Sequence, residues 1–237
     1  MNYKNPYEKL SGKLNNRKLV NAGFSEKTYD TGSVKLNYVV GPKNGPSLLL
    51  IPAQMGMWES YKKVLLPLSK IFQVYAIDVR GHGKSSWTPG HYSWKIIGED
   101  IKIFIENVIK QKVIISGNSS GGIIALWCAA NIPEYISGII LEDAPIFSAE
   151  MPRFKEQDKF VYNGLKHLVN QIGNIPDRDL ANYFQNMEVP ASDKRIKRIP
   201  NWFVSWLSRK IKKFQDKYPD SPVEIGFPDS LRLLIKS

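Results

Sequence analysis

The chain reads Val113-Ile114-Ile115-Ser116-Gly117-Asn118-Ser119-Ser120-Gly121-Gly122-Ile123-Ile124 where an apolar strand meets a glycine-rich turn and a second apolar run. A Gly-x-Ser-x-Gly motif between a strand and a helix is typical of a nucleophile elbow, a tight turn that exposes its serine hydroxyl. Gly117 and Gly121 leave room for the strand and the helix to pack around that serine. Ser119 is therefore the candidate nucleophile, and the alternative is an ordinary glycine-rich turn.

A second motif lies about one strand–helix unit before this turn. Residues 72–77 predict a buried strand that runs into the loop Asp78-Val79-Arg80-Gly81-His82-Gly83-Lys84-Ser85-Ser86. The loop and the later turn, in this order, resemble the α/β-hydrolase superfamily, which carries an Asp-x-Arg-Gly-His-Gly-x-Ser loop before its elbow. The resemblance is sharp from about Leu48 to Pro145 and implies a serine hydrolase with this fold.

Apolar periodicity elsewhere agrees with an α/β architecture. Residues 34–40 alternate in polarity like a hairpin strand, and residues 47–51 form a continuous apolar strand of the kind buried in a parallel sheet. Helical spacing of apolar residues follows at 61–68 and at 96–108, and residues 136–141 predict a further strand. Strands that alternate with helices favour a mostly parallel sheet covered by helices.

The loop after the strand 47–51 is the expected second part of an oxyanion hole. Acyl transfer through a serine develops negative charge on the carbonyl oxygen, which two N–H donors must stabilise. The resemblance assigns one donor to the amide of Ser120 and the other to the amide of Gln54. The loop usually reads His-Gly-x in the family, whereas this chain has Pro52-Ala53-Gln54. Because Ala53 replaces a glycine, its Cβ narrows the backbone conformations open to the loop.

The acid and the base of a catalytic triad are harder to place. Asp143 follows the strand 136–141 and is the candidate acid, although most family members take the acid from the next strand. Its alternative role is hydrogen bonding to nearby backbone amides. His82 is expected to be structural within its loop, and His91 to be exposed. His167, the one histidine after Ser119, lies at helical spacing in a region expected to form a cap, where the base role is the less favoured one.

The chain divides into a predicted core, residues 1–145, with a polar lead-in at 1–22, and a predicted helical cap, residues 146–237. Residues 202–214 place apolar side chains on one helical face, which favours a lid packed on the core over a membrane-surface helix. The family's last two strands, which deliver the usual acid and the base, have no counterpart before Ser237. We therefore expect a chain whose final strands are missing.

Composition limits the classes of partner. The formal net charge is +11, with basic clusters at 194–198 and 209–213, but no nucleic-acid-binding motif accompanies them, so a solvated basic face is expected. No apolar run approaches the roughly 20 residues that a membrane span needs, and the start of the chain lacks the apolar stretch of a signal peptide. Cys128, the single cysteine, is expected to be a packed thiol in a cytoplasmic protein. The sequence leaves the oligomeric state open.

The sequence thus predicts a serine hydrolase that acts on an ester or related acyl bond of a small molecule, impaired if the base is missing. The resemblance implies no cofactor and no metal. Two alternatives stay open at this point. One is a non-catalytic remnant of the fold that binds a small molecule or a partner, and the other is a serine nucleophile that acts on a non-ester substrate.

Overall fold

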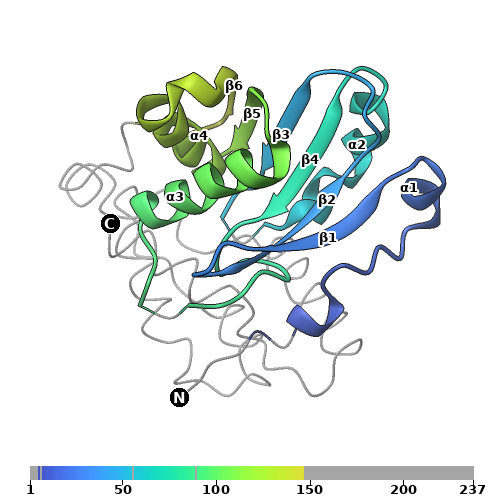
Figure 1. Ribbon diagram of the computed structural model, residues 1–237, viewed down its shortest axis with the longest axis horizontal. Helices are drawn as coiled ribbons and strands as arrows, with labels where there is room; N and C mark the ends of the chain where they lie inside the picture. Colours follow the sequence, from blue (N-terminus) through green and yellow to red (C-terminus); the bar gives the residue numbers. More distant parts are fainter. Residues whose placement is uncertain (1–4, 6, 55, 89, 147–237) are drawn as a thin grey trace, which may run out of the picture.

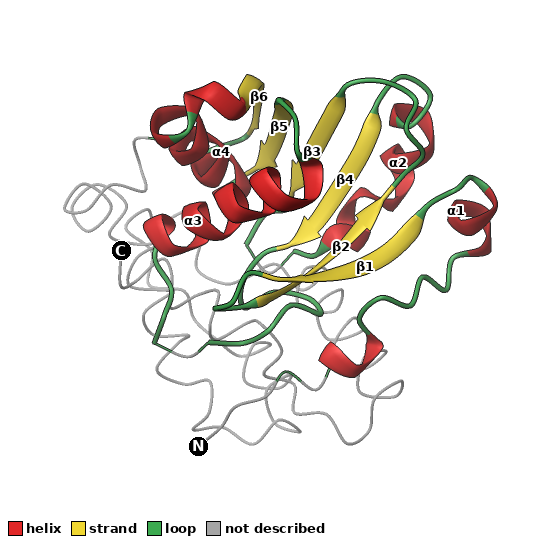
Figure 2. Cartoon of the chain, viewed as in Figure 1, coloured by secondary structure: helices red, strands yellow, loops and turns green. Residues whose placement is uncertain are grey.

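The computed structural model describes residue 5 and residues 7–54, 56–88 and 90–146 of the chain. One sheet of six strands, in the order β1-β2-β4-β3-β5-β6, runs through this part (Figures 1 and 2). The strands are β1 (Ser25–Asp30), β2 (Lys35–Val40), β3 (Ser47–Ile51), β4 (Gln73–Asp78), β5 (Val113–Asn118) and β6 (Ile136–Glu142). The α-helices are α1 (Arg17–Asn21), α2 (Lys62–Leu68), α3 (Trp94–Phe104) and α4 (Ser120–Asn131). Shorter helical turns are η1 (Glu8–Leu10), η2 (Trp58–Tyr61), η3 (Ile105–Ile109) and η4 (Pro133–Tyr135).

The predicted mostly parallel sheet is confirmed. β3 pairs in parallel with β4 and with β5, and β5 pairs in parallel with β6. β1 and β2 form a hairpin whose second strand joins β4 in the antiparallel sense. Because parallel strands end at the same edge of a sheet, the loops after β3, β4, β5 and β6 all emerge together. These are the loops in which the sequence places its candidate site residues.

Successive residues of the central strands supply two separate cores. In β3, Leu49 and Ile51 pack on the face that α3 and α4 cover, whereas Leu48 and Leu50 pack on the face of α2. Figure 1 shows α3 and α4 together in front of the sheet and α2 on the far side. A strand buried on both faces needs apolar side chains at every position, which explains the continuous apolar run of β3.

The described part of the polar lead-in is docked onto the core. Leu19 of α1 is almost fully buried against the α2 side of the sheet. Asn5 is also buried, and its side-chain amide donates hydrogen bonds to the carbonyls of Gly83 and Ser85, at 2.9 and 2.6 Å. Asn5 therefore ties the lead-in to the loop after β4. The polar composition of the lead-in alone does not indicate this contact.

Replacement of Asn16 by alanine is expected to lower the free energy of unfolding by about 1 kcal/mol. The Asn16 side chain caps α1 by accepting hydrogen bonds from the amides of Lys18 and Leu19, at 3.1 and 3.3 Å. Urea unfolding measures the change. The matched control is Asn15→Ala, which removes the same side chain from an exposed position beside the cap. Equal effects of the two substitutions would contradict the capping role.

The predicted cap lies almost wholly outside the described residues. Residues 147–237 include His167, the apolar face at 202–214 and both basic clusters. The division into a core of 1–145 and a cap of 146–237 accordingly stays a prediction. Within the part that the structure describes, no helix combines the length and the apolar character that a membrane span requires.

Candidate active site

Ser119 stands at the junction between β5 and α4, with a backbone conformation that is rare outside glycine. Its φ is 52° and its ψ is −117°. Such a conformation costs on the order of 1–3 kcal/mol, so the surrounding structure must hold it in place. The Ser119 amide donates to the carbonyl of Glu142 at 2.8 Å, and the Ser119 carbonyl accepts from the amide of Gly122 at 2.9 Å. Although Ser119 occupies the N-cap position of α4, its side chain makes no capping hydrogen bond, which leaves the hydroxyl available.

Two glycines let the chain turn this tightly. A Cβ atom on Gly117 would lie 2.2 Å from the carbonyl oxygen of Gly121, across the turn. A Cβ atom on Gly121 would lie 2.3 Å from the carbonyl oxygen of Ile51 and 2.8 Å from that of Pro52. The start of α4 therefore rests directly on the end of β3. This contact brings the loop that carries Gln54 next to the serine.

The two predicted oxyanion donors lie on the elements expected of them. Ser120 begins α4, and the first amides of a helix have no partner within the helix and face its positive end. Gln54 follows β3 by three residues, in a loop where the amide of Gly56 donates to the carbonyl of Ala53 at 2.8 Å. The side-chain nitrogen of Gln54 is buried, and none of the described residues accepts a hydrogen bond from it.

The motif loop after β4 is held by a buried ion pair. The Arg80 guanidinium donates from Nε and Nη2 to the two carboxylate oxygens of Asp100, both at 2.7 Å, and also reaches Ser33 and Thr88. Both charged side chains of the pair are almost fully buried. Arg80 thereby fixes the loop to α3, which carries Asp100.

The two described histidines do not contact Ser119. His82 is 5% exposed, and its Nδ1 lies 3.0 Å from the carbonyl oxygen of Arg80, which agrees with the structural role expected for it. Burial lowers the pKa of His82, so its imidazole is held in the neutral form. His91 is exposed. Neither residue forms a hydrogen bond with the serine, so the described residues supply no base.

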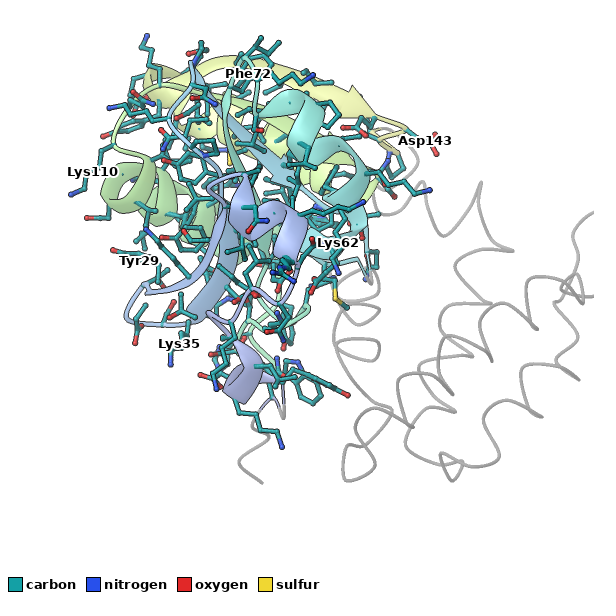
Figure 3. All side chains as sticks on the ribbon, turned by 90° about the vertical axis from the view of Figure 1, so that its right-hand side faces the viewer. Tyr29, Lys35, Lys62, Phe72, Lys110 and Asp143 are labelled. Carbon is teal, nitrogen blue, oxygen red and sulfur yellow. The ribbon has the colours of Figure 1, made fainter. Side chains whose placement is uncertain are left out.

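Asp143 lies in the turn after β6, with a φ of 50° and an exposed side chain. Figure 3 shows it at one end of the described part of the chain, on the opposite side from Lys110, which precedes β5. Its carboxylate makes no hydrogen bond or ion pair with the other described residues, so neither of the two roles expected for Asp143 is visible there. The alternative of bonding to nearby backbone amides is thus not seen for this side chain.

Glu142 is the neighbour of the serine that the sequence did not reveal. Its carbonyl accepts from the Ser119 amide and, at 3.3 Å, from the side chain of Asn118. Its carboxylate accepts a short hydrogen bond from the hydroxyl of Ser116. The parallel register of Asn118 beside Glu142 creates these contacts. The apolar pattern of the two strands carries no signal that fixes this register.

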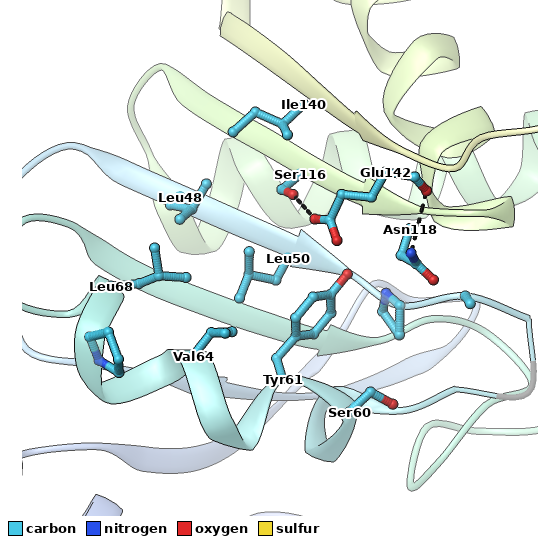
Figure 4. A pocket seen from close by; sticks show the side chains of 13 residues that line it. Leu48, Leu50, Ser60, Tyr61, Val64, Leu68, Ser116, Asn118, Ile140 and Glu142 are labelled. Carbon is cyan, nitrogen blue, oxygen red and sulfur yellow. Dashed lines mark hydrogen bonds between the residues drawn. The ribbon is translucent and has the colours of Figure 1, made fainter.

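A cavity of about 650 Å³ opens between α2 and the sheet (Figure 4). Its floor is apolar, with Leu48, Leu50 and Ile140, and its polar end holds Tyr61 and Glu142. Burial, and after it the charge of Glu142, raises the pKa of Tyr61, whose hydroxyl donates to the carbonyl of Ile51 at 2.9 Å. Ser119 is not among the residues that line this cavity, whereas the preceding residue, Asn118, is.

Cys128 is fully buried in α4, as expected of a packed thiol, and burial raises its pKa to about 12. Among the described residues, histidine, cysteine, aspartate and glutamate side chains form no group of three that could hold a metal ion.

Comparisons with known proteins agree with this arrangement. The family model for the alpha/beta hydrolase fold matches residues 46–220. The chain is 30% identical to "Epoxide hydrolase 4" of Mus musculus over 120 residues, which are 49% of this chain and 33% of that protein. It is 24% identical to a "Serine hydrolase-like protein" of Homo sapiens over 131 residues, 54% of this chain and 64% of that protein. The chain thus spans about a third of the first relative and less than two thirds of the second.

Among solved structures, a hydrolase from Pseudomonas aeruginosa PA01 superposes with a TM-score of 0.64 and 19% sequence identity, over 90% of this chain and 73% of that one. At this identity the likeness concerns the fold. The sheet order, the strained serine between β5 and α4 and the family model over most of the chain lead to one conclusion. The chain belongs to the alpha/beta hydrolase fold family.

Proposed function

We propose that the chain carries the nucleophile and the oxyanion hole of a serine hydrolase that cleaves ester or related acyl bonds of small molecules. The observation that supports this most is Ser119 itself, strained at the elbow with its hydroxyl free of the helix cap. In the proposed reaction the Ser119 oxygen attacks the acyl carbon, and the amides of Ser120 and Gln54 hold the resulting oxyanion. The alcohol or amine then leaves with a proton, and water releases the acid from the serine.

The identity of the nucleophile favours acyl transfer over opening of an epoxide, the activity in the name of one relative. A serine that opened an epoxide would form an ether to the substrate, which water does not cleave readily. A serine that attacks an acyl carbon forms an ester, which an activated water hydrolyses. The Ser119 hydroxyl therefore fits a two-step acyl hydrolysis. In an epoxide reaction it would leave the enzyme blocked by a stable ether on the serine.

Neither of the two described histidines is the base in this proposal, since neither His82 nor His91 forms a hydrogen bond with Ser119. His167, the third histidine of the chain, lies outside the described residues, and its sequence context disfavours it as the base. A serine without a base keeps only the contributions of the oxyanion hole and of binding, which are several orders of magnitude below full catalysis. Asp143 stays the proposed acid only if a histidine approaches the turn after β6. We therefore expect slow turnover of a short-chain nitrophenyl ester by this chain.

A fluorophosphonate probe tests the proposal. We expect covalent labelling at Ser119 ahead of the other serines, and loss of the label in Ser119→Ala, because the elbow aims this hydroxyl at the oxyanion donors. Mass spectrometry of peptides locates the adduct. The matched control is Ser137→Ala, which removes an exposed serine of β6 and should leave the labelling unchanged. Labelling spread evenly over the serines of native and urea-unfolded protein alike would contradict the proposal.

A non-catalytic binding role is the second candidate, and the missing contact between Ser119 and a described histidine favours it. The two candidates differ in the fate of the probe. A binding protein would leave Ser119 unmodified and would still change its melting temperature when it meets its small molecule. Selective labelling of Ser119 supports the hydrolase instead.

A further inference from the structure

One buried carboxyl group ties together three segments beside the elbow. Asp78 ends β4 and has no exposed surface. Its Oδ1 accepts from the backbone amide of Trp58 at 2.7 Å. Its Oδ2 accepts from the side-chain amide of Asn37 at 2.9 Å and from the backbone amide of Lys84 at 3.0 Å. Asp78 thus joins η2, the strand β2 and the loop after β4.

The loop that carries Gln54 runs from the end of β3 to Trp58, at the start of η2. The hydrogen bond from the Trp58 amide to Asp78 fixes the second of these two ends. At its near end this loop leaves β3, where the carbonyls of Ile51 and Pro52 touch the start of α4. At its far end, Trp58 is buried and held twice, by its backbone amide on Asp78 and by its indole nitrogen on Glu26 at 2.9 Å. Between the two ends, the amide of Gly56 donates to the carbonyl of Ala53 at 2.8 Å, which closes a turn within the loop. The position of the Gln54 amide therefore depends on both anchors.

We propose that Asp78 is the positioning residue of the oxyanion loop: its carboxylate holds Trp58, and through Trp58 it sets the Gln54 amide against the serine. This inference rests on the proposed function, because it names what places one of the two proposed oxyanion donors. Asp78 does not touch the substrate in this role. It acts through the backbone of residues 54–58.

A second buried aspartate, Asp100, provides a control that distinguishes an effect on the position of the loop from an effect on the stability of the fold. Asp100 is 2% exposed, but its carboxylate bonds to Arg80 and Ser33 and to none of the described residues of the 52–58 loop. Replacement of either aspartate by asparagine removes the buried negative charge and turns one acceptor oxygen into an N–H donor, so both variants lose folding free energy. Only the Asp78 variant should displace the oxyanion loop.

The charged groups around Asp78 make the hydrogen bonds of its carboxylate depend on pH. Glu59 faces it from η2, while Glu26 of β1 and the Lys84 ammonium form an ion pair beside it, with Glu59 at 3.7 Å from that ammonium. Burial, and after it the charge of Glu59, raises the pKa of Asp78 to about 7. A protonated carboxyl turns one acceptor oxygen into a donor and must release at least one of the three N–H groups. The loop is therefore fully held above this pKa and loosens as the pH falls through it.

Nuclear magnetic resonance tests the loop directly, without need of activity. In the unmodified protein we expect the backbone amide resonance of Trp58 to shift with pH around a midpoint near 7. Asp78→Asn should remove this titration and move the amide resonances of Gly56 and Trp58, because the asparagine presents an N–H where an acceptor stood. Asp100→Asn should keep both the titration and the positions. A Trp58 amide that is unaffected by Asp78→Asn would overturn the inference.

The chemical readout is the rate at which a fluorophosphonate modifies Ser119. Full loss of an oxyanion donor costs about 10²–10³ in rate, so displacement of Gln54 in Asp78→Asn should slow the labelling about tenfold or more. Asp100→Asn, assayed far below its unfolding temperature, should stay within about twofold of the parent rate. Equal slowing in both variants would show a merely structural role. If the parent protein is not labelled, the proposed function fails, and the resonance measurements still decide whether Asp78 positions the loop.

Discussion

Replacement of Gly121 by alanine is expected to lower the free energy of unfolding by about 3 kcal/mol and to remove the selective labelling of Ser119. The added Cβ would meet the carbonyl oxygens of Ile51 and Pro52 at 2.3 and 2.8 Å, and both are backbone atoms of a central strand and its exit. Overpacking of this kind costs on the order of 1–3 kcal/mol, and more where backbone must move. Since α4 has to shift away from β3, Ser120 and Gln54 should separate. Urea unfolding and probe labelling measure the two effects.

Gly138→Ala is the control for this prediction. Gly138 lies in β6, and no heavy atom of the described residues outside its chain neighbours lies within 4 Å of the position that its Cβ would take. We expect its effect on the unfolding free energy to stay within about 0.5 kcal/mol. If Gly121→Ala were as mild as this control and kept its labelling, the close contact between α4 and β3 would not be essential to the elbow.

Arg80→Met is expected to cost about 3–5 kcal/mol, because it leaves the carboxylate of Asp100 buried without its cation. Burial raises the pKa of Asp100, and the Arg80 charge opposes this effect, so the pKa should rise further in the variant. An acid whose pKa is higher in the folded state than in the unfolded state loses stability as the pH rises through the folded value. The cost should therefore be larger at pH 8 than at pH 5, as measured by urea unfolding at both values.

Two further variants check the physical cause of this loss. In Arg80→Met combined with Asp100→Leu, neither charge of this pair remains buried, so part of the lost free energy should return. The surface pair of Lys35 and Glu8, with a distance of 3.8 Å and side chains 46% and 31% exposed, provides the comparison. Lys35→Met should cost less than about 0.5 kcal/mol. A pH-independent loss in Arg80→Met would indicate that the lost packing of the side chain dominates.

The sequence by itself determined the order of strands and helices and the place of the serine. The apolar run at residues 47–51 predicted a strand buried in a parallel sheet and residues 72–77 predicted a second buried strand, and β3 and β4 lie there within one residue. Gly-x-Ser-x-Gly placed Ser119 between a strand and a helix, where the structure has it. These features are local, since apolar spacing and turn residues act over a few positions along the chain.

Only the tertiary structure decided which groups surround that serine. The carbonyl of Glu142 reaches the Ser119 amide because β5 and β6 pair in one register, and a strand pattern does not state its register. Asp78 stands in the sequence as one letter of a motif, yet its three N–H partners come from residues 37, 58 and 84. Asn37 looks like a solvent-facing position of a hairpin strand and is fully buried, because its side chain bonds to Gly12 of the lead-in, Glu26 of β1 and Asp78 of β4. Contacts between distant segments arise from packing, which the local pattern of one chain segment does not encode.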